Sequence, residues 1–378
     1  MPFGPTHDLI KLLSTWSLNA YFQSIISTNS HQVPIDHPII VASNHWNMII
    51  DPALLSTQLT HGIKLHYWAK NTLFKNPIIR FLLIDSGNIP VDRTTKNNQL
   101  LFKGTFDVLK LGEAVALFPE GTSYTEPRIM QIKDGIGWTA LEYAKNLRST
   151  GSKLSGSKET ALGLSSLPQD SEPKDVKIVI VGLNYTSKTR YRSSVQLEYA
   201  EPIEISKRLI TKFMSEDEGD AKSSVKELMT EVDSRLRSVT INSPDWETLW
   251  CAELVREFIW VDGHGPMQHY RDHMQRLIKL FSIPEEDSLS SKPRMKLKSL
   301  KTQLISYHRL LQTYQTNHHV LFNSIPTQSE ETHLILHQSK LILSFLVFKL
   351  PFFILPAFFH LPMYLGSYLG SRLQRKSF

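Results

Sequence analysis

The stretch that decides the fold lies near the amino terminus and reads Ile39-Ile40-Val41-Ala42-Ser43-Asn44-His45-Trp46-Asn47-Met48-Ile49-Ile50-Asp51-Pro52. Its first four residues are apolar and mostly β-branched, which predicts a short buried strand. Asn44 and His45 end that strand, so an imidazole lies at the edge of a sheet. Asp51 follows six residues later, and an imidazole with an orienting carboxylate is the minimum for removing a proton from a hydroxyl. Positions six apart differ by about 120° around a helix, so His45 must precede the helix and the residues between must bend back.

Further apolar runs alternate with helix-like segments along the chain. The predicted strands lie at residues 64–70, 114–118, 176–185 and 194–199, and residues 86–93 are predicted to form a turn, an edge strand and an exposed arginine. Helical patterns lie between or after them, at 51–60, 78–84, 97–110, 135–147 and 222–238. This alternation indicates an α/β sheet, and such sheets carry their sites at the ends of strands.

The chain divides into four segments by composition. We expect an amphipathic amino-terminal helix within residues 1–34, a folded α/β domain at 35–250, a helical extension at 251–335 and an apolar segment at 336–378. Residues 148–175 are rich in Ser, Gly and Lys without an apolar period, which predicts a flexible insert within the domain.

Charge and cysteine content limit the function classes. The 42 Lys and Arg against 36 Asp and Glu leave a net charge of +6, spread along the chain. This favours anionic lipid headgroups or phosphorylated substrates, and we expect no nucleic acid partner. The single cysteine, Cys251, excludes an intrachain disulfide and a multi-cysteine metal site, and suits a reducing, cytosol-facing location. His61 and His66 are five apart, which is not a metal-binding helical spacing, so we expect no metal.

Both ends of the chain carry apolar patterns that suit a membrane. Asp8 and Lys11 interrupt the first residues, so we expect no secretory signal there. Apolar residues recur at near-helical spacing from 9 to 26, which predicts an amphipathic helix lying on a membrane or on the core. The run at 341–359 contains prolines and Lys349, so a bent or re-entrant membrane element and a straight span are both open, with a buried segment as the alternative.

Three further motifs accompany the His45 stretch, in chain order. They are Gly87-Asn88-Ile89-Pro90-Val91-Asp92-Arg93, then Phe118-Pro119-Glu120-Gly121-Thr122-Ser123, then Ile180-Val181-Gly182-Leu183-Asn184-Tyr185. Arg93 can bind a phosphate through two parallel hydrogen bonds, and Gly121 lets the backbone approach a ligand. Lys70 and Lys133 are weaker phosphate candidates, and a solvated charge is the alternative for each.

These four motifs in this order resemble the glycerolipid acyltransferases, the family of glycerol-3-phosphate and lysophosphatidate acyltransferases. The resemblance covers roughly residues 35–250 and implies that family's fold, a mixed and largely parallel sheet flanked by helices. Gly182 stands where the family has proline. Five residues separate His45 from Asp51, as in the fungal glycerol-3-phosphate/dihydroxyacetone-phosphate acyltransferases, whereas most of the family has four. Residues 238–249 are also similar to a segment of the fungal enzymes.

The resemblance implies acyl transfer from acyl-CoA, a co-substrate, to the hydroxyl of glycerol 3-phosphate or dihydroxyacetone phosphate, with no cofactor. His45 would be the general base and Asp51 its partner, while Arg93, Glu120, Gly121 and Thr122 would line the acceptor site. Membrane lipids are expected partners, and the endoplasmic reticulum membrane with a cytosol-facing site is the expected location. The alternatives are a lysophosphatidate acyltransferase and, in another class, a catalytically silent lipid-binding or scaffold protein.

Overall fold

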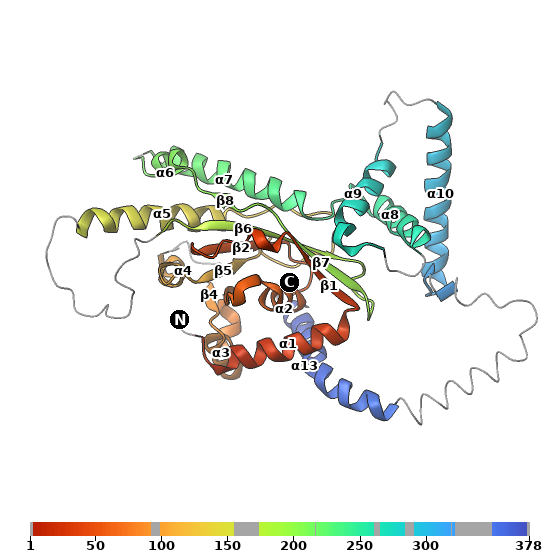
Figure 1. Cartoon of the computed structure of the whole chain (residues 1–378), viewed down its shortest axis with the longest axis horizontal. Coiled ribbons are helices and arrows are strands. Elements are labelled where there is room, and N and C mark those ends of the chain that lie inside the picture. Colours follow the sequence, from red (N-terminus) through yellow and green to blue (C-terminus); the bar gives the residue numbers. More distant parts are fainter. Residues whose placement is uncertain are drawn as a thin grey trace, which may run out of the picture.

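The computed structural model describes residues 3–91, 99–154, 174–215, 217–260, 265–283, 291–318, 320–321 and 350–375. These residues form a mixed α/β fold in which a central sheet lies between two layers of helices (Figure 1). The α/β class and the flanking helices predicted from the sequence are confirmed.

The sheet has eight strands in the order β1-β7-β6-β2-β5-β3-β4, with β8 paired to β6. Strands β6, β2, β5, β3 and β4 run parallel to one another, and β7 and β8 are antiparallel to β6. The strands are β1 (Ser24–Thr28), β2 (Ile39–Ser43), β3 (Leu65–Lys70), β4 (Ile89–Val91), β5 (Ala114–Leu117), β6 (Lys177–Tyr185), β7 (Ser194–Tyr199) and β8 (Ile203–Glu204). Because β2, β5 and β6 are parallel, their carboxyl ends meet at one edge of the sheet.

Both faces of the sheet are covered, so its central strands are apolar on both sides. Ile40 and Ala42 of β2 face the layer of α4 (Gln99–Lys110), α5 (Gly135–Leu154), α6 (Lys207–Phe213) and α7 (Glu218–Ser238). Ile39 and Val41 face α1 (Pro5–Tyr21) and α2 (Ile50–Gln58). Helix α3 (Pro77–Asp85) packs beside α1. Short 3₁₀ turns occur at Ser30–Gln32, Thr60–Gly62, Asn71–Lys75 and Met267–His269.

The amino-terminal segment differs from the expectation of one helix. Helix α1 ends at Tyr21, and Ser24–Thr28 form β1, which pairs in parallel with β7. Ile25 and Ile26 continue the apolar spacing of α1, but as β-branched residues they suit the strand equally. The sheet therefore begins within the segment assigned to a separate helix.

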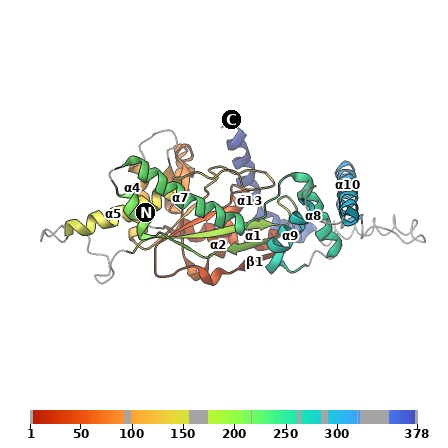
Figure 2. The ribbon, with the colours of Figure 1, turned by 90° about the horizontal axis from the view of Figure 1, so that it is seen from above.

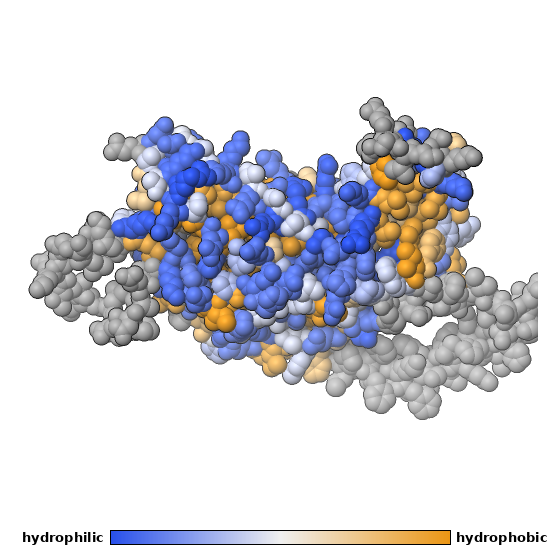
Figure 3. Space-filling view, turned by 45° about the horizontal axis from the view of Figure 1, so that its top comes forward, coloured by the Kyte–Doolittle hydropathy of each residue, from blue (hydrophilic) through white to orange (hydrophobic). Residues whose placement is uncertain are grey.

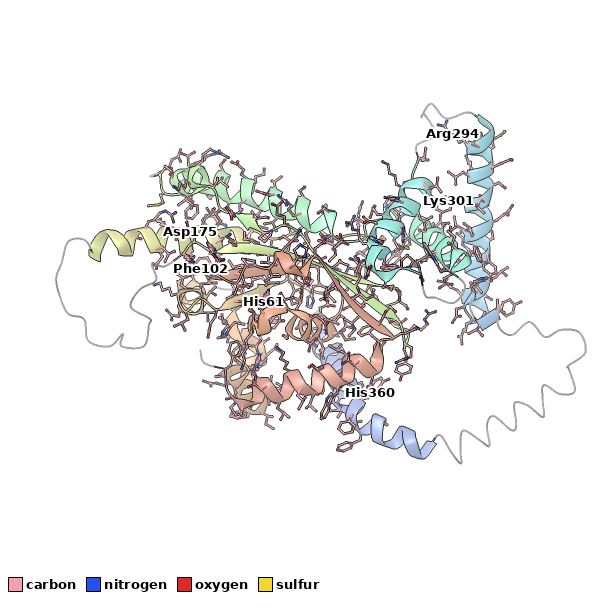
Figure 4. The ribbon with its side chains drawn as sticks, viewed as in Figure 1. His61, Phe102, Asp175, Arg294, Lys301 and His360 are labelled. Atoms are coloured by element: carbon pink, nitrogen blue, oxygen red, sulfur yellow. The ribbon has the colours of Figure 1, made fainter. Side chains whose placement is uncertain are left out.

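The helical extension packs on the right-hand end of the sheet in Figure 1 and consists of α8 (Trp246–Ile259), α9 (Tyr270–Phe281) and α10 (Ser291–Thr313). Lys301 of α10 joins the three helices, because its Nζ donates to Thr248 Oγ1 of α8 at 2.8 Å and to the Phe281 carbonyl of α9 at 3.1 Å (Figure 4). Hydrophobic side chains gather on this extension, while the face over the sheet is largely hydrophilic (Figure 3).

The carboxyl-terminal helix α13 (Leu350–Arg375) continues through three prolines and packs against α1. Trp16 of α1 and Phe359 of α13 meet edge to face with ring centroids 5.6 Å apart. The next residue of α13, His360, is labelled in Figure 4. The end of α13 projects from the body of the molecule (Figure 2). Among the described residues, no helix combines the length and apolarity needed to cross a membrane. The apolar run at 341–349 lies outside the described residues.

The first residues of the predicted insert at 148–175 are helical. Helix α5 continues to Leu154, and Arg148 within it forms a two-point ion pair with Asp175, with both N–O distances at 2.8 Å. Residues 155–173 of the insert lie outside the described part of the chain.

Candidate active site

Strand β2 delivers His45 to the carboxyl edge of the sheet. The side chain of Asn44, which is fully buried, extends the pairing of β2 with β6: its Nδ2 donates to the Leu183 carbonyl at 3.0 Å and its Oδ1 accepts from the Leu183 N–H at 2.7 Å. This amide acts as one more rung of the sheet and holds the next residue, His45, in place.

The imidazole of His45 and the carboxylate of Asp51 lie within hydrogen-bond distance. His45 Nδ1 is 3.0 Å from Asp51 Oδ2. Helix α2 begins at Ile50, and residues 44–49 form the bend that returns the chain, with Asn47 Oδ1 accepting from the N–H groups of Ile49 and Ile50. The bend required by the six-residue separation is therefore present, and Asp51 lies in the first turn of the helix.

Asp51 is fully buried and its carboxylate is surrounded by donors. Oδ2 also accepts from the backbone N–H groups of Trp46 at 2.6 Å and Asn47 at 2.7 Å, and Oδ1 accepts from the hydroxyl of Tyr185. Burial, with the charge of Asp51, raises the pKa of Tyr185 well above its usual value, so Tyr185 stays a donor. These donors compensate a buried negative charge.

This arrangement determines which nitrogen of His45 can act as a base. A carboxylate only accepts, so Nδ1 carries the hydrogen and the lone pair is on Nε2. The structure shows no hydrogen bond to Nε2 from any described residue. The imidazole stacks on Phe118 with ring centroids 4.1 Å apart and remains 11% exposed. His45 is thus a fixed imidazole with one accessible basic nitrogen.

Glu120 lies beneath the His45 turn rather than in an open pocket. Its Oε1 accepts the backbone N–H of His45 at 2.7 Å, and Oε2 is 3.4 Å from the N–H of Met130. The side chain is nearly fully buried, and burial raises the pKa of Glu120. Both carboxylate oxygens of Glu120 already accept backbone hydrogen bonds. This geometry favours a role in positioning His45 over a role in binding the acceptor directly.

The turn after Glu120 brings two other predicted residues together. Gly121 has a φ of +76°, and a Cβ there would lie 2.6 Å from Lys133 Nζ. Lys133 therefore lies directly over Gly121, and its own N–H donates to the Pro119 carbonyl at 2.8 Å. Thr122 is partly exposed in the same turn.

The remaining predicted residues follow β3 and β4, which run parallel to β5 and β2. Lys70 is the exposed last residue of β3, and it pairs in register with Val91 of β4. Arg93 lies outside the residues that the structure describes.

The sequence motifs included Tyr185 without giving it a role. Its hydroxyl reaches Asp51 because β6 and β2 are parallel neighbours that end together. Tyr185 is the last residue of the last motif strand, and this position is the feature of the sequence from which its place beside His45 could have been predicted. Trp46 and Lys188, which also lie at this edge, had no signal in the sequence beyond their nearness to motif residues.

Comparison with known proteins gives the same assignment as the motifs. Residues 24–150 match the family model Acyltransferase. Glycerol-3-phosphate O-acyltransferase 1 of Saccharomyces cerevisiae is 24% identical over 224 residues, covering 58% of this chain and 25% of that protein. Glycerol-3-phosphate O-acyltransferase 2 of the same yeast is 25% identical over 255 residues, covering 67% and 30%. This chain thus spans less than a third of the length of either yeast relative.

A relative named for another acceptor also matches. A chloroplastic 1-acyl-sn-glycerol-3-phosphate acyltransferase of Arabidopsis thaliana is 28% identical over 130 residues, covering 34% of this chain and 35% of that protein. The predicted resemblance to glycerolipid acyltransferases is confirmed by these matches.

Proposed function

We propose that this chain, whose residues 24–150 match the acyltransferase family, transfers an acyl group from acyl-CoA to the hydroxyl of glycerol 3-phosphate or dihydroxyacetone phosphate. With glycerol 3-phosphate the product is lysophosphatidate. The two yeast relatives named as glycerol-3-phosphate O-acyltransferases support this choice of acceptor. The observation that carries the proposal is the His45–Asp51 pair at the carboxyl edge of the sheet.

In the proposed reaction, His45 Nε2 takes the proton from the acceptor hydroxyl as its oxygen attacks the thioester carbonyl. The imidazolium that forms is stabilised by Asp51, whose charge is buried and 3.0 Å from Nδ1. Collapse of the tetrahedral intermediate breaks the carbon–sulfur bond, and the proton on Nε2 passes to the departing thiolate. Acyl transfer then needs no enzyme nucleophile.

The acceptor side of the site rests on residues around the Gly121 turn. We assign phosphate binding to Arg93, with Lys70 and Lys133 as further cations and with Gly121 and Thr122 lining the acceptor. The position of Lys133 over Gly121 and of Lys70 at the carboxyl end of β3 supports this assignment. Glu120 contributes by holding the backbone of His45.

A membrane surface is the proposed location of the reaction, because one group of helices exposes many large apolar side chains. Helix α1 packs against both α3 and α13. The exposed apolar residues on these three helices include Leu9, Leu12, Trp16, Ile78, Phe81, Phe358, Leu361 and Leu365. Such a surface suits insertion into the headgroup region, and Arg372 on α13 suits an anionic leaflet. An endoplasmic reticulum location stays a prediction.

The acceptor assay tests the proposal most directly. Purified protein is given labelled acyl-CoA with glycerol 3-phosphate, dihydroxyacetone phosphate or 1-acyl lysophosphatidate, in vesicles of phosphatidylcholine and phosphatidic acid. We expect transfer to glycerol 3-phosphate, with the label in lysophosphatidate, and co-sedimentation of the protein with the vesicles. Transfer to 1-acyl lysophosphatidate alone, with the label in phosphatidate, would support the rival acceptor suggested by the Arabidopsis relative and overturn our first choice.

The same assay separates an enzyme from a silent lipid-binding protein. An enzyme loses turnover in the His45→Gln variant, whereas a scaffold binds vesicles equally with and without the imidazole. Absence of transfer to all three acceptors by the unaltered protein, with vesicle binding retained, would favour the scaffold.

A further inference from the structure

Lys188 lies beside the proposed catalytic pair and is not accounted for by it. It follows β6 by three residues, and therefore lies at the same sheet edge as His45. Its Nζ is 3.5 Å from the centroid of the Trp46 ring. The Nζ atom is buried, and no described residue accepts a hydrogen bond from it. Lysine ammonium groups are seldom buried without a partner, so this one requires an explanation.

The indole under Lys188 belongs to the structure that holds the base. Trp46 directly follows His45, its backbone N–H donates to Asp51 Oδ2 at 2.6 Å, and its ring stacks on Tyr185 with centroids 6.2 Å apart. A cation over an indole face is attracted by the ring, but this attraction replaces only part of the lost hydration. The ammonium is therefore held near the reacting groups with most of its hydrogen-bonding capacity unused.

The charges of four carboxylates act on this ammonium. Burial lowers the pKa of Lys188 to about 8, and Asp51, Glu120, Glu253 and Glu126 oppose that shift in decreasing order. Asp51 and Glu120 already accept several hydrogen bonds each. Glu253 comes from α8 of the extension, and burial raises its pKa to about 7, which weakens it as a counter-ion.

The surroundings of Lys188 suit the binding of an anionic group of a substrate. A structural lysine would pair with one of the nearby carboxylates, as Arg271 does with Glu198 through two hydrogen bonds. Here the ammonium is desolvated in advance, over the Trp46 ring and just beyond the end of the last motif strand. A desolvated cation binds a phosphate group more strongly than a hydrated one, because less water must be displaced.

We propose that Lys188 is a substrate-binding residue that takes a phosphate group next to the base. The inference rests on the proposed function, since both acyl-CoA and glycerol 3-phosphate carry phosphate. Either source satisfies the chemistry at Lys188.

Binding measurements with the full chain distinguish the two sources. Isothermal titration with glycerol 3-phosphate and, separately, with coenzyme A is compared for the unaltered protein, Lys188→Met and Lys188→Arg. Methionine keeps the stem over Trp46 without the charge. We expect Lys188→Met to weaken one of the two ligands by roughly tenfold or more, with Lys188→Arg restoring most of the loss. The ligand affected identifies the source of the phosphate.

A neighbouring charge on the same loop supplies the matched control. Arg190 is exposed two residues away, and Arg190→Met removes one positive charge without altering Lys188 or Trp46. We expect both affinities to be unchanged in this variant. Equal affinities of Lys188→Met and the unaltered protein for both ligands would overturn the inference, as would equal losses in Lys188→Met and Arg190→Met.

The pH dependence of binding tests the inference without any substitution. Lys188 is charged below its pKa of about 8 and neutral above it, so affinity for the phosphate ligand should fall by about fivefold between pH 8 and pH 9. A flat profile for both ligands would overturn the proposal even if Lys188→Met fails to fold. These binding readouts are independent of turnover: absence of acyl transfer with intact Lys188-dependent binding refutes the proposed function and leaves the phosphate site standing.

Discussion

Two histidine–carboxylate pairs lie at opposite edges of the same sheet. His45 and Asp51 lie at the carboxyl edge, after β2. His66 lies at the amino edge, as the second residue of β3, with its Nε2 2.8 Å from Glu113 Oε2 and its Nδ1 2.6 Å from the Gly87 carbonyl. Both pairs have the residue types of a general base with its partner.

Exposure is distributed in opposite ways in the two pairs. At the carboxyl edge the carboxylate of Asp51 is 0% exposed and the imidazole of His45 is 11% exposed. At the amino edge the imidazole of His66 is 0% exposed and the carboxylate of Glu113 is 33% exposed. A base must present a nitrogen to its substrate, while its partner gains strength from burial. The first pair meets both conditions and the second meets neither.

Hydrogen bonding makes the same distinction. Both ring nitrogens of His66 lie against acceptors, and Phe3 covers its ring with centroids 4.1 Å apart. Gly87, with a φ of +78°, is required there because a Cβ would lie 2.6 Å from the Phe3 ring. His66 thus connects β3, the start of β4 and the start of β5, which is a structural task. The pair type alone does not distinguish the proposed catalytic pair from a structural pair; the open nitrogen does.

The largest expected effect comes from exchanging each histidine for glutamine. His45→Gln should lower kcat by roughly 10²–10⁴-fold, since a general base is lost, with little change in melting temperature. His66→Gln should leave kcat nearly unchanged and reduce the free energy of unfolding by about 1–3 kcal/mol, because buried partners lose hydrogen bonds. Steady-state kinetics and thermal unfolding of both variants measure this. The reverse assignment, with turnover lost only in His66→Gln, would break the comparison.

The second prediction concerns the carboxylate. Asp51→Asn should lower kcat by about 10²–10⁴-fold, because an amide neither fixes the Nδ1–H tautomer nor stabilises the imidazolium. Asp8→Asn is the matched control: Asp8 Oδ1 is also 2.9 Å from a histidine nitrogen, that of His7, but its side chain is 66% exposed on α1. Its kcat should equal that of the unaltered protein. Turnover retained in Asp51→Asn, measured with saturating substrates, would refute the role given to this carboxylate.

Much of this site was predictable because local pattern and strand order determine it. The apolar run of β2 ending in Asn44-His45, and the Phe118–Gly121 turn after β5, are local signals, and parallel strands bring their ends together. The six-residue separation required a bend, and the bend is present at residues 44–49. The sequence therefore predicted that His45 and Asp51 pair, and that the residues between them bend back.

Other features depend on contacts between distant segments, which a single sequence does not reveal. Gly182 was the weakest motif position, yet a Cβ there would lie 1.9 Å from the Val239 carbonyl, because residues 239–241 cross β6 at this point. Asn184 secures that crossing by donating to the Val239 carbonyl at 2.9 Å and accepting from the Ile241 N–H at 3.1 Å. The strand β1 and the burial of Glu120 were missed for the same reason, since β-pairing and enclosure are tertiary properties.

The smallest predicted effect tests how far the burial of Asp51 matters. Tyr185→Phe removes the hydroxyl that donates to Asp51 Oδ1 and leaves a buried carboxylate oxygen without that donor. We expect kcat to fall by about 3–30-fold, corresponding to part of a charged hydrogen bond. Tyr199→Phe removes an equally buried hydroxyl from the neighbouring strand, where it makes only a 3.5 Å contact with the Gln58 carbonyl. If both variants lose turnover equally in steady-state assays, the loss reflects general packing. If only Tyr185→Phe loses turnover, the hydrogen bond to the buried carboxylate of Asp51 is a feature that distinguishes the His45 pair from the His66 pair.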